Sequence, residues 1–125
     1  MSDDLSRAVA KVLDEYEESV IETVQRVTNE LAKEGLSKVK AASPVSGKSP
    51  KSSAYKSGWM KKVVTNRMGA SAIIYNGKYP GLVHLLEKGH ALRNGGRSAA
   101  YPHVEPVQEW MSDELQKRIK EAIQK

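Results

Sequence analysis

The chain of 125 residues contains no cysteine and no phenylalanine. Without cysteine it can form no disulfide, no thiol nucleophile and no cysteine-bound zinc site, and this composition fits a cytosolic protein. Because tyrosine and tryptophan together supply only seven aromatic residues, the core should be mostly aliphatic, with the two tryptophans as its largest side chains. The length suffices to bury one core, so we expect a single domain over residues 1–125.

Long apolar runs are also missing. No stretch approaches the ~18 apolar residues that a transmembrane helix needs. The first residues, MSDD, lack the basic start and the apolar segment of a secretory signal. We therefore expect no membrane contact, and a protein that is made in the cytoplasm and used there or carried in a particle assembled there.

Acidic residues are absent from the middle of the chain. Residues 35–86 have a net charge of +9 and no acidic side chain, whereas residues 1–34 have a net charge of −5. Residues 87–125 add +1, which gives the whole chain a formal charge of +5. An acidic and a basic block can attract nucleic acid or another copy of the chain, or can neutralise each other within one fold.

Apolar residues recur at helical spacing along the first quarter of the chain. They are Leu5, Val9, Leu13, Tyr16, Val20, Val24, Val27 and Leu31. Their mean spacing of about 3.7 residues is closer to a straight helix than to a left-handed coiled coil. A helix from about residue 4 to 41 would be about 55 Å long, which exceeds what so small a domain can cover. Part of it should lie against another chain, unless Gly35 breaks it.

Residues 43–57 read SPVSGKSPKSSAYKS and include six serines and two prolines. This polar composition predicts a long, flexible loop at about 43–57. The Gly47-Lys48-Ser49 segment does not complete a phosphate-binding loop, because Ala42 stands where that pattern needs its first glycine.

Beyond this loop the pattern changes to that of strands. Residues 59–66 and 71–75 carry β-branched side chains and predict two strands, with a hairpin turn at 67–70 between them. The Asn76-Gly77 pair then ends the second strand.

Helix signals return in the last third of the chain. Pro80 suits the first turn of a short helix, and Gly89 suits its left-handed end. The Asn94-Gly95-Gly96 sequence predicts a projecting hairpin at about 90–101, and a last amphipathic helix begins at Pro106. The predicted fold is therefore α+β: a long N-terminal helix, a small antiparallel sheet with a hairpin and long loops, and a C-terminal helix.

No group of side chains predicts catalysis. His84, Glu87 and His90 stand three residues apart, but helix positions i and i+6 lie on different faces, and the zinc-protease pattern needs histidines four apart. No serine lies in a Gly-x-Ser-x-Gly turn. We expect no enzyme, metal or cofactor, and expect the histidines to bind backbone groups or a neighbouring subunit.

Basic residues of the middle section could contact phosphates. The candidates to face DNA are Lys48, Lys51, Lys56, Lys61 and Lys62, with Arg67, Lys78, Arg93 and Arg97 as further phosphate contacts and Tyr55, Trp59 and Tyr75 interleaved among them. No recognition helix accompanies them, so any such contact would be independent of the nucleotide sequence.

Two segments, HLLEKGHA at 84–91 and PHVEP at 102–106, are unusual in composition and order. With SPVSG at 43–47, they resemble the gene-product-ten-like neck or tail-completion proteins of long-tailed bacteriophages. That family has an Ala-Pro-Val-x-Thr-Gly-x-Leu-like segment after its first helix, and here Ser46 replaces the threonine and no leucine follows. The resemblance is strongest from Tyr75 to the end of the chain.

The resemblance implies a structural protein of the virion that forms a ring at the head–tail junction after assembly in the host cytoplasm. The implied partners are copies of itself, a head-closure or connector protein, and tail tube or tail terminator proteins, with non-specific contact to packaged DNA as a further option. The residues that we assign to the interface are His84, Glu87, His90, Arg93, Arg97, Pro102 and His103.

Two other hypotheses stay open at this point. The basic middle section is compatible with a small nucleic-acid-binding module that acts on its own. A toxin-like ribonuclease is the third hypothesis, and it depends only on the histidine and arginine content.

Overall fold

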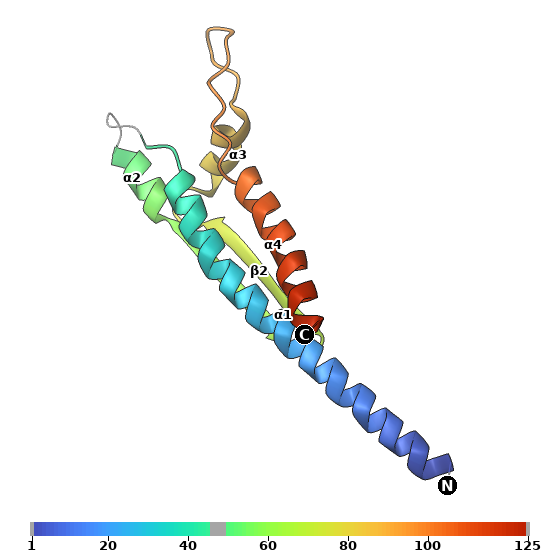
Figure 1. The fold of residues 1–125 in the computed structure, drawn as a ribbon. Helices are drawn as coiled ribbons and strands as arrows, with labels where there is room; N and C mark the ends of the chain where they lie inside the picture. Colours follow the sequence, from blue (N-terminus) through green and yellow to red (C-terminus); the bar gives the residue numbers. More distant parts are fainter. Residues whose placement is uncertain (1, 46–49, 125) are drawn as a thin grey trace.

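The computed structural model describes residues 2–45 and 50–124 (Figure 1). Its elements are α1 (Ser2–Ala42), α2 (Pro50–Ser57), β1 (Trp59–Asn66), β2 (Gly69–Asn76), α3 (Pro80–Lys88) and α4 (Glu105–Ile123). This order confirms the predicted α+β fold class. None of the described helices is both long enough and apolar enough to cross a membrane.

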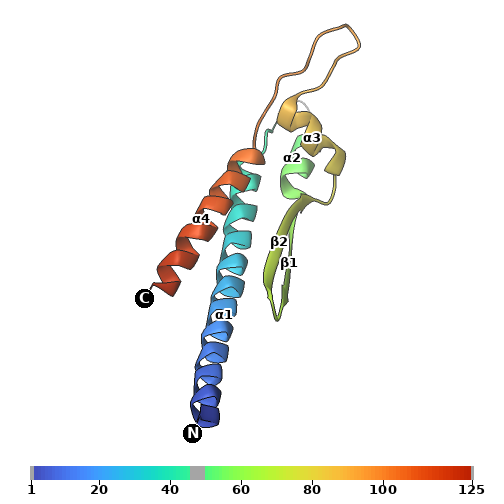
Figure 2. The same cartoon turned by 90° about the vertical axis from the view of Figure 1, so that its right-hand side faces the viewer.

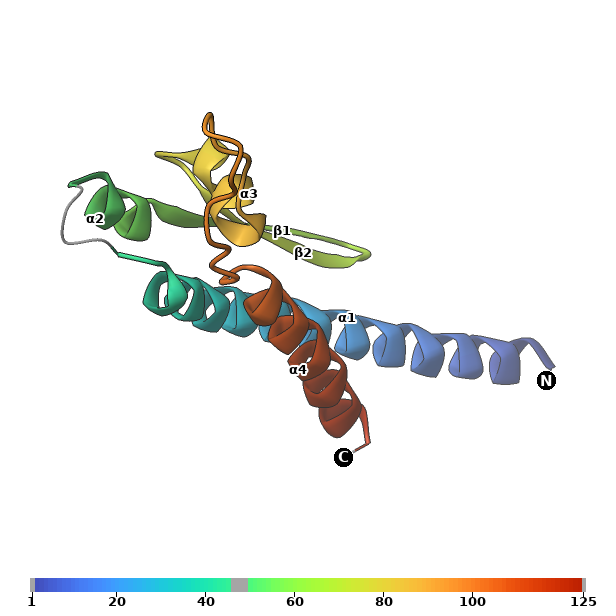
Figure 3. The ribbon, with the colours of Figure 1, turned by 90° about the horizontal axis from the view of Figure 1, so that it is seen from above.

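The helix α1 lies between the other layers. Figure 2 shows α4 on one side of α1 and the hairpin of β1 and β2 on the other. The short helices α2 and α3 lie near the C-terminal end of α1, and the segment between α3 and α4 projects from that end. At the opposite end the N-terminal half of α1 extends past both neighbouring layers, as Figure 3 also shows.

The predicted first helix is confirmed, and it runs through Gly35 without a break. Gly35 is instead the place where α4 and β2 come closest to α1. A Cβ atom added there would lie 2.5 Å from Sδ of Met111 and 2.9 Å from Cδ1 of Ile74. These distances are shorter than real Cβ contacts, so the missing side chain allows the two layers to converge on the helix.

The hairpin pairs its strands antiparallel, with Trp59 opposite Asn76 and Asn66 opposite Gly69. Only Arg67 and Met68 form its turn, so β2 begins at Gly69 and not at residue 71 as predicted. Successive side chains of a strand point to opposite faces of the sheet. The inner face, which includes Trp59 and Ile74, packs toward α1, and the alternate residues point away from it.

Residues 50–57 form the helix α2, which corrects the prediction of a loop over the whole of 43–57. The serine- and lysine-rich composition of this stretch does not indicate a buried residue. Tyr55 is nevertheless buried and anchors the helix against Trp59, with ring centroids 5.6 Å apart. Residues 46–49 of the predicted loop lie outside the described residues.

The core at this end combines apolar side chains with buried polar ones. Val39, Tyr55, Trp59 and Val107 form its buried centre. Trp59 Nε1 donates a hydrogen bond to Ser43 Oγ at 2.7 Å, and Ser43 donates to the carbonyl of Val39 at 2.6 Å. Every buried side-chain nitrogen and oxygen in the described part of the chain has such a partner. These bonds fix β1 against the end of α1.

Gly35→Val should destabilise the fold, because the added methyl groups must displace Met111 and Ile74. We expect the free energy of unfolding to fall by about 2–4 kcal/mol from overpacking, which urea titration of the buried Trp59 fluorescence would measure. Ser37→Val is the matched control, since Ser37 is exposed on the same helix and should change stability by only about 0.5 kcal/mol. Equal effects of the two variants would contradict the close approach at Gly35.

Candidate assembly interface

Five large apolar side chains in the N-terminal half of α1 are not covered by any of the described residues. Leu5, Val9, Val12, Leu13 and Tyr16 are 49–68% exposed, and we call them the N-terminal stripe. Their helical spacing places them on one side of α1. All the side chains described from residue 4 to 19 are exposed, whereas α1 is buried at several positions from Val27 on. A contiguous exposed apolar surface of this kind marks an interaction site.

The stripe continues the side of α1 on which α4 packs. Five helical turns take 18 residues, so Tyr16 lies on the same side as Glu34, and Val9 on the same side as Val27. Glu34 accepts hydrogen bonds from Arg118 of α4, one of them at 3.1 Å. Val27 and Arg118 line a cleft together. The stripe therefore begins where α4 ends (Figure 1).

A second uncovered apolar surface lies on the hairpin. Met60, Val64, Ile73 and Tyr75 alternate with the inward residues and are 39–57% exposed. We call these four residues the outer sheet face. Lys62 stands among them, directly opposite Ile73 in the register. The outer sheet face points away from α1, whereas the stripe lies on the α4 side of α1.

The exposed area of the whole chain is larger than its mass predicts. A folded monomer of 13.8 kDa exposes about 6,600 Å². This chain exposes 9134 Å², an excess of about 2,500 Å². A standard protein interface buries about 800 Å² from each partner, so the excess is enough for more than two such contacts.

The projecting segment before α4 is fixed at its base by one carboxylate. Glu87 of α3 accepts hydrogen bonds from the backbone N–H groups of His103 and Val104, both at 2.9 Å, and of Glu105 at 2.8 Å. Such groups at the start of a helix have no partner within it. Glu87 thus caps α4 from another helix, and its negative charge also suits the positive end of the helix dipole.

His103 lies beneath this cap and is buried. Its Nε2 is 2.6 Å from the hydroxyl of Tyr55, and its Nδ1 is 2.7 Å from the carbonyl oxygen of Tyr101 and 3.0 Å from the Glu87 carboxylate. Both neighbours of Nδ1 are acceptors, so Nδ1 carries a proton. In the neutral imidazole Nε2 then accepts from the Tyr55 hydroxyl. One side chain thus joins α2, α3 and the start of α4.

This packing shifts the pKa values of Tyr55 and Glu87. Burial raises the pKa of Tyr55 to about 12, and the nearby Glu87 charge acts in the same direction. Burial would also raise the pKa of Glu87, but the three backbone donors and His103 outweigh it and hold this pKa below its ordinary value of 4.5. At neutral pH Tyr55 therefore keeps its proton and Glu87 keeps its charge, as their hydrogen bonds require.

The seven residues predicted for the interface fall into an exposed group and a largely buried group. His84, His90, Arg93, Arg97 and Pro102 are exposed. Glu87 and His103 have side chains that are only 11% and 1% exposed, and they hold this chain's own loop. In the described ranges no three His, Asp or Glu side chains converge to hold a metal ion.

Of these exposed residues His84 lies on α3, and the other four lie in the projecting segment. Arg97 Nη2 lies 3.4 Å from the carbonyl oxygens of Lys88 and Gly89, at the C-terminal end of α3, where a cation is favoured. His90 Nδ1 lies 2.9 Å from Ser98 Oγ. A bridge between Ala91 and Arg97 makes the segment hairpin-like.

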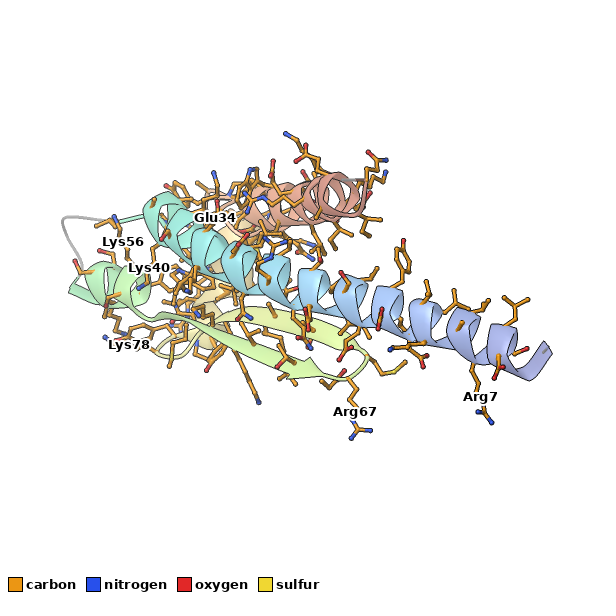
Figure 4. The ribbon with its side chains drawn as sticks, turned by 60° about the horizontal axis from the view of Figure 1, so that its bottom comes forward. Arg7, Glu34, Lys40, Lys56, Arg67 and Lys78 are labelled. Atoms are coloured by element: carbon orange, nitrogen blue, oxygen red, sulfur yellow. The ribbon has the colours of Figure 1, made fainter. Side chains whose placement is uncertain are left out.

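The lysines predicted to face DNA do not share one surface. Lys51 and Lys56 are exposed on α2. Lys61 and Lys62 are consecutive strand residues and point to opposite faces of the hairpin. Lys48 lies outside the described residues. Figure 4 shows Lys56 and Lys78 at one end of the hairpin and Arg67 at its tip.

Comparison with known families gives a match over most of the chain. The model of the family described as "Bacteriophage HK97-gp10, putative tail-component" matches residues 7–89. The match includes most of the N-terminal stripe, the hairpin and α3, and it ends before the PHVEP segment at 102–106. Of the stretch from Tyr75 to the end of the chain, where the sequence motifs suggested the strongest resemblance, the match covers residues 75–89 and leaves out 90–125. No curated protein and no solved structure is significantly similar to this chain.

Glu87→Gln should weaken the cap, because the amide has no charge and only one acceptor oxygen for three N–H donors. We expect the free energy of unfolding to fall by about 1–3 kcal/mol at pH 7. Since the folded pKa of Glu87 is lowered, this contribution is present above pH 4.5 and is lost as the pH falls through the folded value. Urea titrations between pH 7 and pH 3 measure it.

The matched control for this variant is Glu109→Gln, because Glu109 is exposed on α4. It should change stability little at any pH. A stability difference between Glu87→Gln and the unmodified chain that stayed constant down to pH 3 would contradict the ionised cap.

Proposed function

The chain belongs to the HK97 gp10-like family of bacteriophage tail components, and from this premise we propose that it forms an oligomeric ring at the phage head–tail junction. Family membership makes it a structural protein of the virion. In the proposal, the ring connects a head-closure or connector protein on one side to tail tube or tail terminator proteins on the other.

The observation that carries the proposal is the uncovered N-terminal stripe. A tail component whose longest helix leaves five apolar side chains in solvent needs a partner to cover them. The excess exposed area is large enough for a contact on each side of a subunit, as a closed ring requires. The projecting segment around residues 90–101 adds a third surface, which could reach the proteins above or below the ring (Figure 1).

We also propose that the chain acts without catalysis. His103 and Glu87 lie close together, and hydrogen bonds in the interior occupy both side chains. His84 and His90 are exposed on α3 and on the projecting segment. This arrangement favours a structural role over the ribonuclease hypothesis.

The basic hairpin supports a second candidate, which is sequence-independent contact with DNA. Residues 59–76 carry three basic and no acidic side chains. Arg67 at the hairpin tip is exposed and points away from α1 (Figure 4). Such contacts would be weakened strongly by salt.

The ring proposal predicts self-association that weakens as salt is added, because the exposed surfaces carry opposite charges. Sedimentation velocity and negative-stain microscopy of the purified protein should show a closed oligomer. A phage or prophage deleted for this gene should yield filled heads and complete tails that do not join. Joined, infectious particles without the protein would contradict the proposal.

A mobility-shift assay separates the second candidate. Sub-micromolar binding of duplex DNA by the monomer at physiological salt would favour the nucleic-acid-binding module. The ring proposal predicts much weaker binding by the monomer.

A further inference from the structure

We propose that the N-terminal stripe of one copy packs on the outer sheet face of the next copy. This inference rests on the proposed ring and names the contact that closes it. Each copy would use two different surfaces. Its N-terminal stripe would contact one neighbour, and its outer sheet face would contact the other neighbour.

The directions of the two surfaces favour this contact. The stripe lies on the α4 side of α1, and the outer sheet face points away from α1 on the hairpin side. A chain with a straight α1 cannot bring them together within itself (Figures 2 and 3). Two different patches on different sides of a subunit join copies head to tail, and such a contact closes into a ring when the rotation allows it.

The two surfaces also match in size and chemistry. From Leu5 to Tyr16 the stripe spans 11 helical steps, or about 17 Å. From Met60 to Val64 the outer sheet face spans four strand steps, or about 13 Å. Both consist of exposed aliphatic side chains and one tyrosine, so the contact would place a helix on the open face of a two-stranded sheet, a common layer arrangement.

The charges around the two surfaces are opposite. Residues 4–18 have a net charge of −3, and the hairpin residues 59–76 have a net charge of +3. Glu15 and Glu17 flank the stripe, about 100° to either side of Tyr16 around the helix. Lys62 stands within the outer sheet face. This complementarity would steer the copies together and select the register. Two stripes packed against each other would instead bring two acidic segments together.

The absence of native cysteine makes crosslinking a direct test. Chains carrying Val12→Cys are mixed with chains carrying Val64→Cys, both at exposed sites, and are oxidised under assembly conditions. We expect a disulfide-linked heterodimer in the mixture. The double variant, which has both sites on one chain, should give a ladder of higher oligomers.

Arg7→Cys paired with Val64→Cys is the matched control. Arg7 is exposed on α1, but it lies on the hairpin side, 18 residues before Gln25, whose side chain binds the hairpin at Asn66. Figure 4 shows Arg7 and Arg67 pointing to the same side. Crosslinking of this control as efficiently as Val12→Cys would overturn the proposal. The proposal would also be overturned if Val12→Cys chains linked mainly to each other, because that product indicates stripe-to-stripe packing.

Charge exchange gives a second measurement that needs no crosslink. Lys62→Glu should raise the self-association Kd by about tenfold or more, and Glu15→Lys with Glu17→Lys should restore part of the loss in a mixture. Lys56→Glu, which changes an exposed lysine on α2, should have less effect. Equal effects of Lys62→Glu and Lys56→Glu would count against the contact.

The outcomes distinguish this inference from the proposed function. Rings that form normally without the Val12–Val64 crosslink would overturn the inference and leave the ring function standing. A specific crosslink in a protein that phage assembly does not need would support the contact and remove the head–tail role. A monomer with no crosslink under any condition would overturn the inference.

Discussion

The length of α1 relative to the layers that cover it is the constraint on which the rest of the structure depends. A helix of 41 residues measures about 60 Å, and the hairpin and α4 cover it only from about residue 20 onward. A helix without tertiary contacts is marginal in water, so residues 4–18 are the least stabilised part of α1 in the isolated chain. The apolar stripe and the large exposed area both follow from this mismatch, and the proposed assembly would cover them.

The covered end of the molecule is organised differently, around buried polar groups. Glu87 reaches from α3 to the first N–H groups of α4, and His103 connects that cap to Tyr55 of α2. These bonds hold the base of the projecting segment without help from a neighbour. The chain thus combines one end that is complete by itself with another end that is open to a partner.

Most elements could be predicted from the sequence, because their signals are local. Periodic apolar residues gave α1 and α4, β-branched runs gave the hairpin, and Pro80 and Gly89 marked the limits of α3. The helix α2 could not be predicted in this way, since it depends on one buried residue, Tyr55, within a serine- and lysine-rich stretch.

The candidate site was only partly predictable. The over-long helix indicated a missing partner, but Glu87 meets its three donors 16 to 18 residues further along the chain, and no sequence pattern shows that contact. The histidine between two prolines resembled a surface residue until the packing of Tyr55 and Trp59 showed it buried. Which face of the hairpin stays open also depends on tertiary packing.

Hydrogen exchange followed by mass spectrometry, on the dilute monomer and on the assembled protein, measures whether the N-terminal half of α1 depends on a partner. Backbone amides of residues 4–18 should exchange rapidly in the monomer and become protected in the assembly, whereas residues 27–42 should be protected in both. Equal protection of residues 4–18 in the two states would show that this part of α1 needs no partner.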